Sequence, residues 1–163
     1  MELARAAAKV IHLNGERLVG RTRLQKTFYF LEELDVGFNI TFDYYHYGPY
    51  SEELSIAAED AEALQLIDVE WKFTNAGTKY AVYSSHSNME EEDVDIKRRE
   101  VLKVLGKYDA VTLEIAATAD YLSKNGFQKD PWGETKRRKP EKTNPDRITQ
   151  ASKLISELAS LHH

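Results

Sequence analysis

The feature that most constrains the fold is a change of hydrophobic period between Asn39 and Leu66. Apolar and polar residues largely alternate from Asn39 to Tyr47, which is typical of a β-strand with one buried face. We expect this strand to end at Gly48-Pro49, because proline has no N–H to donate to a β-ladder. Ser51 then predicts a helix N-cap, and apolar residues recur at the helical period as far as Leu66. A strand, a tight turn and a helix start must therefore fit into one short stretch of chain.

Periodicity and capping signals predict the remaining elements. Helices are expected at 2–14, 21–34, 52–66, 90–107, 110–124 and from Asn144 onward. Thr22 and Gln25 have the spacing of a capping box at the start of the second helix. Residues 68–73 predict a second strand, and residues 78–83 are compatible with either a returning hairpin strand or a short helix.

This order of elements predicts a mostly helical α+β fold in a single domain, residues 1–163. Helix, helix, strand, helix, strand and a candidate third strand is close to the order of a winged helix, so we predict a winged-helix-like core at 1–88. A helical C-terminal half follows, with a helical hairpin at 89–128, an exposed basic linker at 129–143 and a C-terminal helix at 144–163. Winged helices bind DNA in some cases and proteins in others, so the fold leaves the function open.

The composition argues against several kinds of chemistry. The chain has 163 residues, no cysteine and a net charge of −5. Disulfides, thiolate metal sites and cysteine nucleophiles are excluded, and a surface built mainly for phosphate backbones is disfavoured. The Gly-rich phosphate loop, the Gly-x-Ser-x-Gly elbow and the His-Glu-x-x-His pattern are absent from the sequence. We therefore expect no cofactor, no metal and no catalytic residue.

Membrane and export signals are not found in the sequence. No apolar run approaches the ~18 residues of a membrane span, and the first residues lack the basic and then apolar pattern of a signal peptide. We expect a cytoplasmic location and no membrane partner. His162 and His163 are compatible with native residues or with the remainder of a purification tag, and neither is assigned to a site.

Two segments resemble a known family. Residues 20–26 (Gly-Arg-Thr-Arg-Leu-Gln-Lys) and 42–54 (Phe-Asp-Tyr-Tyr-His-Tyr-Gly-Pro-Tyr-Ser-Glu-Glu-Leu) resemble the YwgA-like family of small prokaryotic proteins. More remotely, the Leu-Gln-Lys helix and the Gly-Pro turn are similar to the Panacea domain of SocA-type antitoxins. That domain is taken to be a non-enzymatic module that recognises protein toxins or delivers them to a protease. The first resemblance implies no activity, and the second implies a protein partner such as a toxin.

The tyrosines of this stretch are the first candidate site. Tyrosine is large, stiff and amphipathic, which favours it at interaction hot spots, although alternate tyrosines can also simply pack on both sides of a half-buried strand. On the functional interpretation, the partner-binding residues are Tyr45, Tyr47, Gly48, Pro49 and Tyr50. Tyr44 and His46 would face the core, and His46 is interpreted as structural because it has no partner at ligand spacing. We predict a non-enzymatic protein-interaction module, antitoxin-like or regulatory.

Nucleic acid is the alternative partner. Basic residues gather at the start of the second helix and in the 129–143 segment, namely Arg21, Arg23, Lys26, Lys136, Arg137, Arg138 and Lys139. They could contact phosphates, or they could simply be solvated charges. Assembly with further copies of the chain also stays open.

A metal-dependent nuclease is a remote further alternative. Glu70 and Lys72 are two residues apart on an expected strand and would point the same way. Together with a distant acid such as Asp43 or Asp60, they would give carboxylates for Mg²⁺ and a lysine beside the nucleophile. The Glu-x-Lys pattern is equally compatible with a solvated strand face.

Overall fold

The N-terminal half of the chain joins three helices to a small antiparallel sheet. The computed structural model describes residues 2–86 and 89–161, so His162 and His163 lie outside the described residues. The N-terminal elements are α1 (Glu2–Leu13), β1 (Arg17–Val19), α2 (Arg21–Glu33), β2 (Asp43–Tyr45), β3 (Gly48–Tyr50), α3 (Glu52–Ala63), β4 (Ile67–Phe73) and β5 (Lys79–Ser85). One sheet has the strand order β1-β5-β4, and β2 pairs with β3 in a separate hairpin.

The mostly helical α+β fold is as predicted, with the strands confined to the N-terminal half. The elements α1, β1, α2, α3, β4 and β5, with β5 at the centre of the sheet, follow the winged-helix order. The β2–β3 hairpin is an insertion between α2 and α3. Residues 79–85 form a strand that pairs with β4 from Ile67↔Ser85 to Phe73↔Lys79, which selects the hairpin strand over the short helix for this segment.

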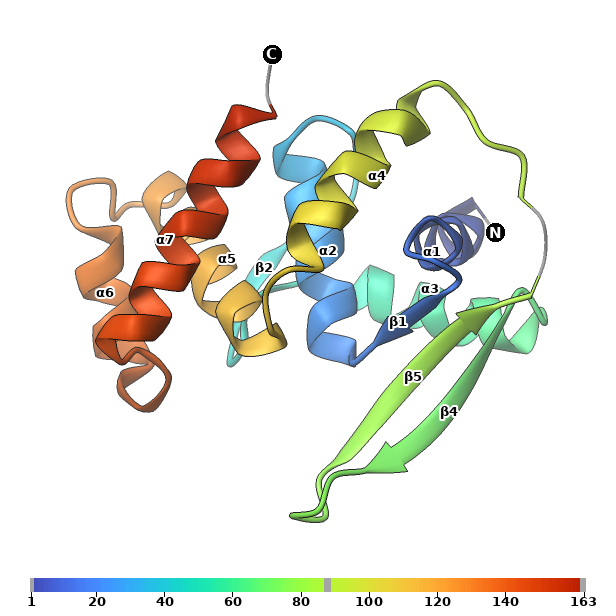
Figure 1. Cartoon of the computed structure of the whole chain (residues 1–163), viewed down its shortest axis with the longest axis horizontal. Coiled ribbons are helices and arrows are strands. Elements are labelled where there is room, and N and C mark those ends of the chain that lie inside the picture. The colour runs from blue at the N-terminus through green and yellow to red at the C-terminus, as the bar shows by residue number, and fades with distance from the viewer. Residues whose placement is uncertain (1, 87–88, 162–163) are drawn as a thin grey trace.

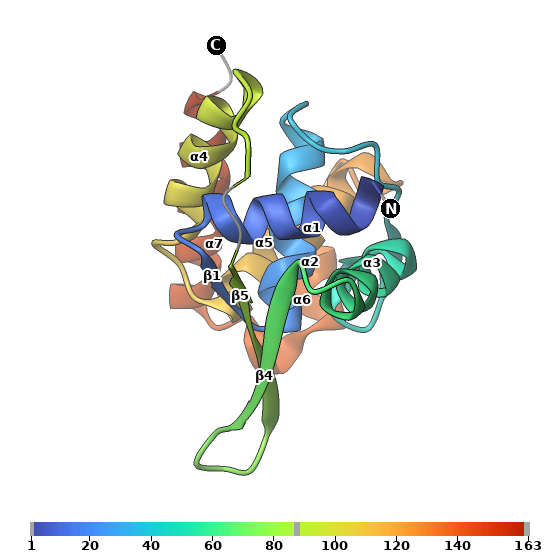
Figure 2. The same ribbon diagram turned by 90° about the vertical axis from the view of Figure 1, so that its right-hand side faces the viewer.

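The β4–β5 hairpin is a wing that projects away from the helices (Figures 1 and 2). Ile67, Ala81 and Tyr83 near its base are buried, whereas every residue from Glu70 to Lys79 is exposed. The base of the wing is thus part of the core, and its outer part meets solvent on both faces.

The C-terminal half is helical and is organised around one buried helix. Its elements are α4 (Val94–Leu105), α5 (Ala110–Lys124), α6 (Pro131–Arg138), the 3₁₀ turn η1 (Pro140–Lys142) and α7 (Pro145–Ser160). Helix α5 packs against α2, β3, α6 and α7 and is buried along most of its length. Figure 1 shows α6 and α7 on the far side of α5 from the wing.

The segment predicted as an exposed linker, 129–143, is largely helical. Helix α6 begins at Pro131 after Asp130, whose carboxylate accepts a hydrogen bond from the Gly133 N–H at 3.0 Å. Thr135 and Lys139 in this segment are buried. The linker prediction is wrong because the basic run was interpreted as solvated, although an aspartate cap followed by proline at the first helical position is a helix start.

The predicted strand at 39–47 is wrong in its extent. Only Asp43–Tyr45 is paired as a strand, and the chain turns at His46 and Tyr47 and returns through Gly48 and Pro49 as β3. Proline is tolerated because each strand of a two-stranded hairpin has a free edge. The capping box does not form either, since the N-cap of α2 is Gly20 without a side-chain hydrogen bond.

Small residues let two helices of the core approach closely. Helices α1 and α3 pack against each other, and both bury alanines, including Ala4 and Ala7 on α1 and Ala57, Ala58 and Ala61 on α3. These residues lose no side-chain entropy on burial.

An ionic network attaches α4 to the N-terminal half. The buried carboxylate of Asp95 accepts from Lys9 and from Arg98, each at 2.9 Å. Arg98 also donates to the carbonyl of Val36 at 2.7 Å, in the segment that follows α2. Every buried charge here has a partner, which is what burial of an ion requires.

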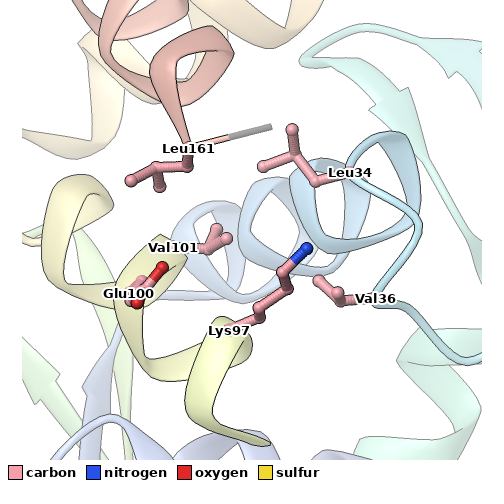
Figure 3. Close-up of a pocket in the computed structure, with 6 residues that line it drawn as sticks. All are labelled: Leu34, Val36, Lys97, Glu100, Val101 and Leu161. Carbon is pink, nitrogen blue, oxygen red and sulfur yellow. The ribbon is translucent and has the colours of Figure 1, made fainter. Parts of the chain in front are cut away.

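A small cavity lies beside this network. It is lined by residues that follow α2, by residues of α4 and by the residue after α7, namely Leu34, Val36, Lys97, Glu100, Val101 and Leu161 (Figure 3). Its volume is about 10 Å³, which is room for one water at most, so it is not a ligand site. In residues 2–86 and 89–161, no helix is long and apolar enough to cross a membrane.

Candidate functional site

The candidate site is the β2–β3 hairpin, residues 43–50, which we call the tyrosine hairpin. Asp43 pairs with Tyr50 and Tyr45 with Gly48, so that His46 and Tyr47 form the turn. Gly48 has a φ of 88°. Residues other than glycine rarely adopt this left-handed backbone conformation. A Cβ at this position would also overlap the hydroxyl of Thr118 on α5. The hairpin thus lies against α5 only because residue 48 is glycine.

The base of the tyrosine hairpin is fixed by Gln25 of α2. The Gln25 amide donates to the Ser51 carbonyl at 3.0 Å, and its oxygen accepts from the Ser51 N–H at 2.8 Å. Ser51 in turn caps α3, since its hydroxyl accepts from the Leu54 N–H at 3.1 Å. Both Gln25 and Ser51 are buried. The predicted N-cap role of Ser51 is confirmed, and Gln25 links the hairpin to α2 rather than closing a capping box.

Lys26 of α2 is hydrogen-bonded to the second strand of the tyrosine hairpin. Its side chain is 1% exposed, and Nζ donates to the Pro49 carbonyl at 2.6 Å. Burial lowers the pKa of Lys26 to about 7; the negative charge of Glu114 opposes this shift, and the positive charges of Lys139 and Lys142 add to it. A buried lysine with a pKa near neutrality is therefore hydrogen-bonded directly to the hairpin backbone.

Lys139 is hydrogen-bonded to the turn of the tyrosine hairpin. Its Nζ donates to the His46 carbonyl at 2.7 Å and pairs with Glu114 at 2.9 Å. Lys142 pairs with the same carboxylate at 3.1 Å. We call Lys26, Lys139, Lys142 and Glu114 the lysine cluster. It joins α2, α5 and the 139–142 segment beneath the hairpin, and it holds three amino groups for one carboxylate.

The outer face of the hairpin combines exposed tyrosines with cations. Tyr45 is 47% exposed and Tyr47 is 56% exposed. The Lys142 Nζ lies 4.9 Å from the centre of the Tyr47 ring, and the Arg138 guanidinium lies 4.8 Å from the centre of the Tyr44 ring, both within cation–π range. Since α5 and the lysine cluster fix the backbone, these rings are presented on a preorganised support.

An open cleft runs beside the turn. Its volume is about 470 Å³, and it is lined by Tyr44, Tyr45, His46, Arg138 and Lys139. This volume falls in the range of small-ligand and side-chain pockets. The lining is aromatic and cationic, which favours an anionic group on the binding partner.

The predicted partner-binding residues fall into two groups. Tyr45 and Tyr47 face solvent as predicted, and Tyr50 is half-buried with its ring against Tyr45 at 5.2 Å between centres. Gly48 and Pro49 are buried, so they shape the hairpin and do not form its outer surface.

Of the two residues expected to face the core, one does so. Tyr44 is half-buried and packs on Tyr121 of α5 at 5.9 Å between ring centres. His46 is exposed. The prediction that it faces inward is wrong, because the chain turns at residues 46 and 47 and the strand alternation stops there.

The basic residues proposed for nucleic acid at the start of α2 do not form one exposed edge. Arg21 is exposed, whereas Arg23 donates to the carbonyls of Leu105 at 3.2 Å and Tyr108 at 2.5 Å. Lys26 is fully buried. The prediction that Lys26 contacts phosphate at the surface is therefore wrong. The hydrogen bonds of Arg23 join α2 to the end of α4.

The second basic set lies on α6 and at its C-cap, next to the tyrosine hairpin. Lys136, Arg137 and Arg138 are exposed, and Lys139 is buried. Glu134 pairs with Arg137 at 2.6 Å and with Arg138 at 2.7 Å. A direct phosphate contact by Lys139 is disfavoured because its amino group already holds Glu114 and the hairpin turn.

The residues considered for a nuclease do not assemble. Glu70 and Lys72 lie 3.4 Å apart on the exposed wing, while Asp43 is on the tyrosine hairpin and Asp60 on α3. Across the parts of the chain that the structure describes, no three histidine, aspartate or glutamate side chains gather to hold a metal ion. The predicted constellation is therefore wrong.

The sequence interpretation did not single out Glu114. One signal was available, because Glu114 lies between Leu113 and Ile115 in the alanine-rich first half of α5. Glutamate is rarely buried without a charged partner, so this position required a lysine or arginine from elsewhere in the chain. The identity of those partners, Lys139 and Lys142, depends on the folding of 129–143 back over α5.

The chain is similar to a known protein over part of its length. No family model matches the chain, and no solved structure matches it. Over 52 residues the chain is 40% identical to the "Uncharacterized protein YwgA" of Bacillus subtilis (strain 168). The match covers 32% of this chain and 31% of that protein, so it spans about a third of each. The similarity to YwgA is thus partial, and these comparisons do not support the resemblance to the Panacea domain.

Proposed function

We propose that this protein is a protein-interaction module, antitoxin-like or regulatory, which binds an acidic segment of a partner protein at the tyrosine hairpin. The observation that carries the proposal is the pair of exposed rings, Tyr45 and Tyr47, on a hairpin whose backbone is fixed by Gln25, Lys26 and Lys139. Tyrosine and arginine are enriched at binding hot spots. A support that is already ordered also avoids an entropy cost on binding.

The preference for an acidic segment follows from the charges around the cleft. Arg138, Lys139 and Lys142 border the hairpin. Glu114 pairs with the two lysines and Glu134 pairs with Arg138, so two carboxylates face these three cations. A carboxylate from the partner could bind beside Arg138 while an apolar neighbour packs on Tyr45. Complementary charge of this kind contributes mainly to specificity and to the rate of association.

The test is the capture of partners by the intact protein and by a Tyr45→Ala/Tyr47→Ala variant. Both side chains are exposed, so the variant should fold normally while losing capture. Ile96→Ala is the matched control, because Ile96 is a 66% exposed apolar residue on α4, away from the hairpin. A captured protein is then purified, and its Kd is measured with and without an acidic peptide as competitor. Equal Kd values for the parent and the double variant would contradict the site assignment.

Nucleic acid is the second candidate, and one observation favours it. The same face places cations on aromatic rings, with Lys136 and Arg137 next to them, as surfaces for single-stranded nucleic acid do. Helix α3 argues against reading of a duplex by the winged-helix core, because it exposes Glu52, Glu53, Glu59, Asp60 and Glu62. Binding to single strands should weaken steeply as salt rises. No binding at about 50 mM salt, the low end of the range used for such tests, would remove this candidate.

A further inference from the structure

The outer edge of the wing is an unpaired strand. The sheet has the order β1-β5-β4, so β4 is hydrogen-bonded along one side by β5, and no strand among the described residues pairs with its other side. Residues 70–73 of β4 are all exposed. Figure 2 shows the wing well clear of the helical body, which leaves this edge open to another chain. An exposed edge of this kind is a template for strand addition.

The sequence of β4 is complementary to itself about Trp71. Val69, Trp71 and Phe73 share one face of the strand, and Glu70 and Lys72 share the other. In an antiparallel pair of two β4 strands centred on Trp71, Glu70 of each copy lies opposite Lys72 of the other. Val69 lies opposite Phe73 in the same way. One face of the pair is therefore an apolar strip and the other carries two ion pairs.

We propose that β4 pairs antiparallel with β4 of a second copy of this chain, with Trp71 on the two-fold axis. Two three-stranded sheets would then become one continuous sheet. The pairing would shield Phe73 and Trp71, which are 66% and 41% exposed, and would replace the ion pair between Glu70 and Lys72 within one chain by two pairs between chains. This surface is separate from the tyrosine hairpin, and the inference goes beyond the proposed function.

Two cations of each copy lie close to the proposed two-fold axis. Lys79 and Arg21 lie 4.4 Å and 5.4 Å from the Trp71 ring centre, so the electrostatics of a pair must also accommodate them. Lys79 lies on β5 opposite Phe73, but its amino group reaches over the Trp71 ring, which is on the proposed axis. Repulsion between the cations of the two copies therefore opposes pairing, and salt reduces this repulsion.

Charge reversal gives a direct test. Glu70→Lys alone places lysine opposite the partner's Lys72 at two symmetric positions, and Lys72→Glu alone has the mirror effect. Each should weaken the dimer roughly tenfold or more. The combined Glu70→Lys/Lys72→Glu variant restores complementary pairs and should recover the dimer. Both substitutions are on exposed side chains, and circular dichroism would check that each of the three variants is folded.

The measurement is the molar mass by light scattering across a concentration series, together with amide hydrogen exchange of β4. Glu62→Lys and Lys103→Glu are matched controls, since both reverse an exposed charge on a helix. Weakening by each single reversal and recovery in the double variant would support the proposal, as would protection of the β4 amides that rises with concentration. A parent protein that stays monomeric up to ~1 mM, or a dimer that both single reversals leave unchanged, would overturn it. Tyr45→Ala/Tyr47→Ala should leave the dimer intact.

Discussion

The tyrosine hairpin and the wing are both two-stranded and both expose large aromatic side chains, yet they are held in different ways. The tyrosine hairpin lies on α5, and the carbonyls of His46, Pro49 and Ser51 each accept from a buried side chain. Among the described residues, the strands of the outer wing are hydrogen-bonded only to each other, and residues from Glu70 to Lys79 are exposed. Buried polar partners therefore make one hairpin a fixed surface, and their absence leaves the other an open strand edge.

The largest loss in the free energy of unfolding is expected at Glu114, the one carboxylate of the lysine cluster that holds the tyrosine hairpin. Glu114→Ala removes the carboxylate that Lys139 and Lys142 share and leaves their amino groups without a buried counter-ion. Loss of one partner of a buried ion pair costs ~3–5 kcal/mol. Urea unfolding would measure the loss, with Glu100→Ala as an exposed control on α4. A loss below about 1 kcal/mol would mean that the lysine cluster does not hold the hairpin.

A somewhat smaller loss is expected from Gly48→Ala. The new Cβ would meet the Thr118 hydroxyl, and the φ of 88° is unfavourable for alanine. The backbone strain alone is worth ~1–3 kcal/mol. Combining Gly48→Ala with Thr118→Ala should remove the part of the loss that comes from the steric overlap. The part that comes from backbone strain should remain. Gly77→Ala, at the tip of the wing with a φ of 86° and open space around it, is the matched control for strain without overlap. If Gly48→Ala and Gly77→Ala lower the free energy of unfolding equally, the overlap with Thr118 of α5 does not contribute to the loss at Gly48.

The third prediction concerns pH. Lys26 has a pKa lowered to about 7 by burial, whereas in the unfolded chain it titrates near 10.5. Between these values the unfolded chain binds a proton that the folded protein does not, so raising the pH stabilises the folded form. The free energy of unfolding of the parent minus that of Lys26→Met should rise by roughly 1 kcal/mol per pH unit in this window. Surface variant Lys103→Met should show no such slope.

If the difference in the free energy of unfolding between the parent and Lys26→Met does not change between pH 7 and 10, Lys26 remains charged in the folded protein. In that case Glu114 would outweigh burial, and the lysine cluster would be a fully ionised network.

These contrasts also explain which parts of the structure the sequence could predict. Helices α2 and α5 were predicted within one residue of their observed bounds, and the start of α7 within one residue of Pro145, because caps and apolar periods are local signals. The Ser51 cap was predicted for the same reason. The lysine cluster was not, because Lys26 and Lys139 meet at the hairpin from opposite ends of the chain, and no local pattern records that. Lys26 was interpreted as an exposed basic residue, although its place between Gln25 and Thr27 on a helix buried on several sides favours burial.

The smallest effect is expected on the wing. Phe73→Ser removes a large ring, but the ring is 66% exposed, so the free energy of unfolding in dilute protein should change by no more than ~0.5 kcal/mol. Tyr83→Ala, at the wing base and 4% exposed, is the matched control and should cost ~3–5 kcal/mol. A large loss for Phe73→Ser in dilute protein would mean that the outer wing is part of the core after all. A loss that appears only as the protein concentration rises would instead place Phe73 at a contact between copies, because association stabilises the folded state by mass action.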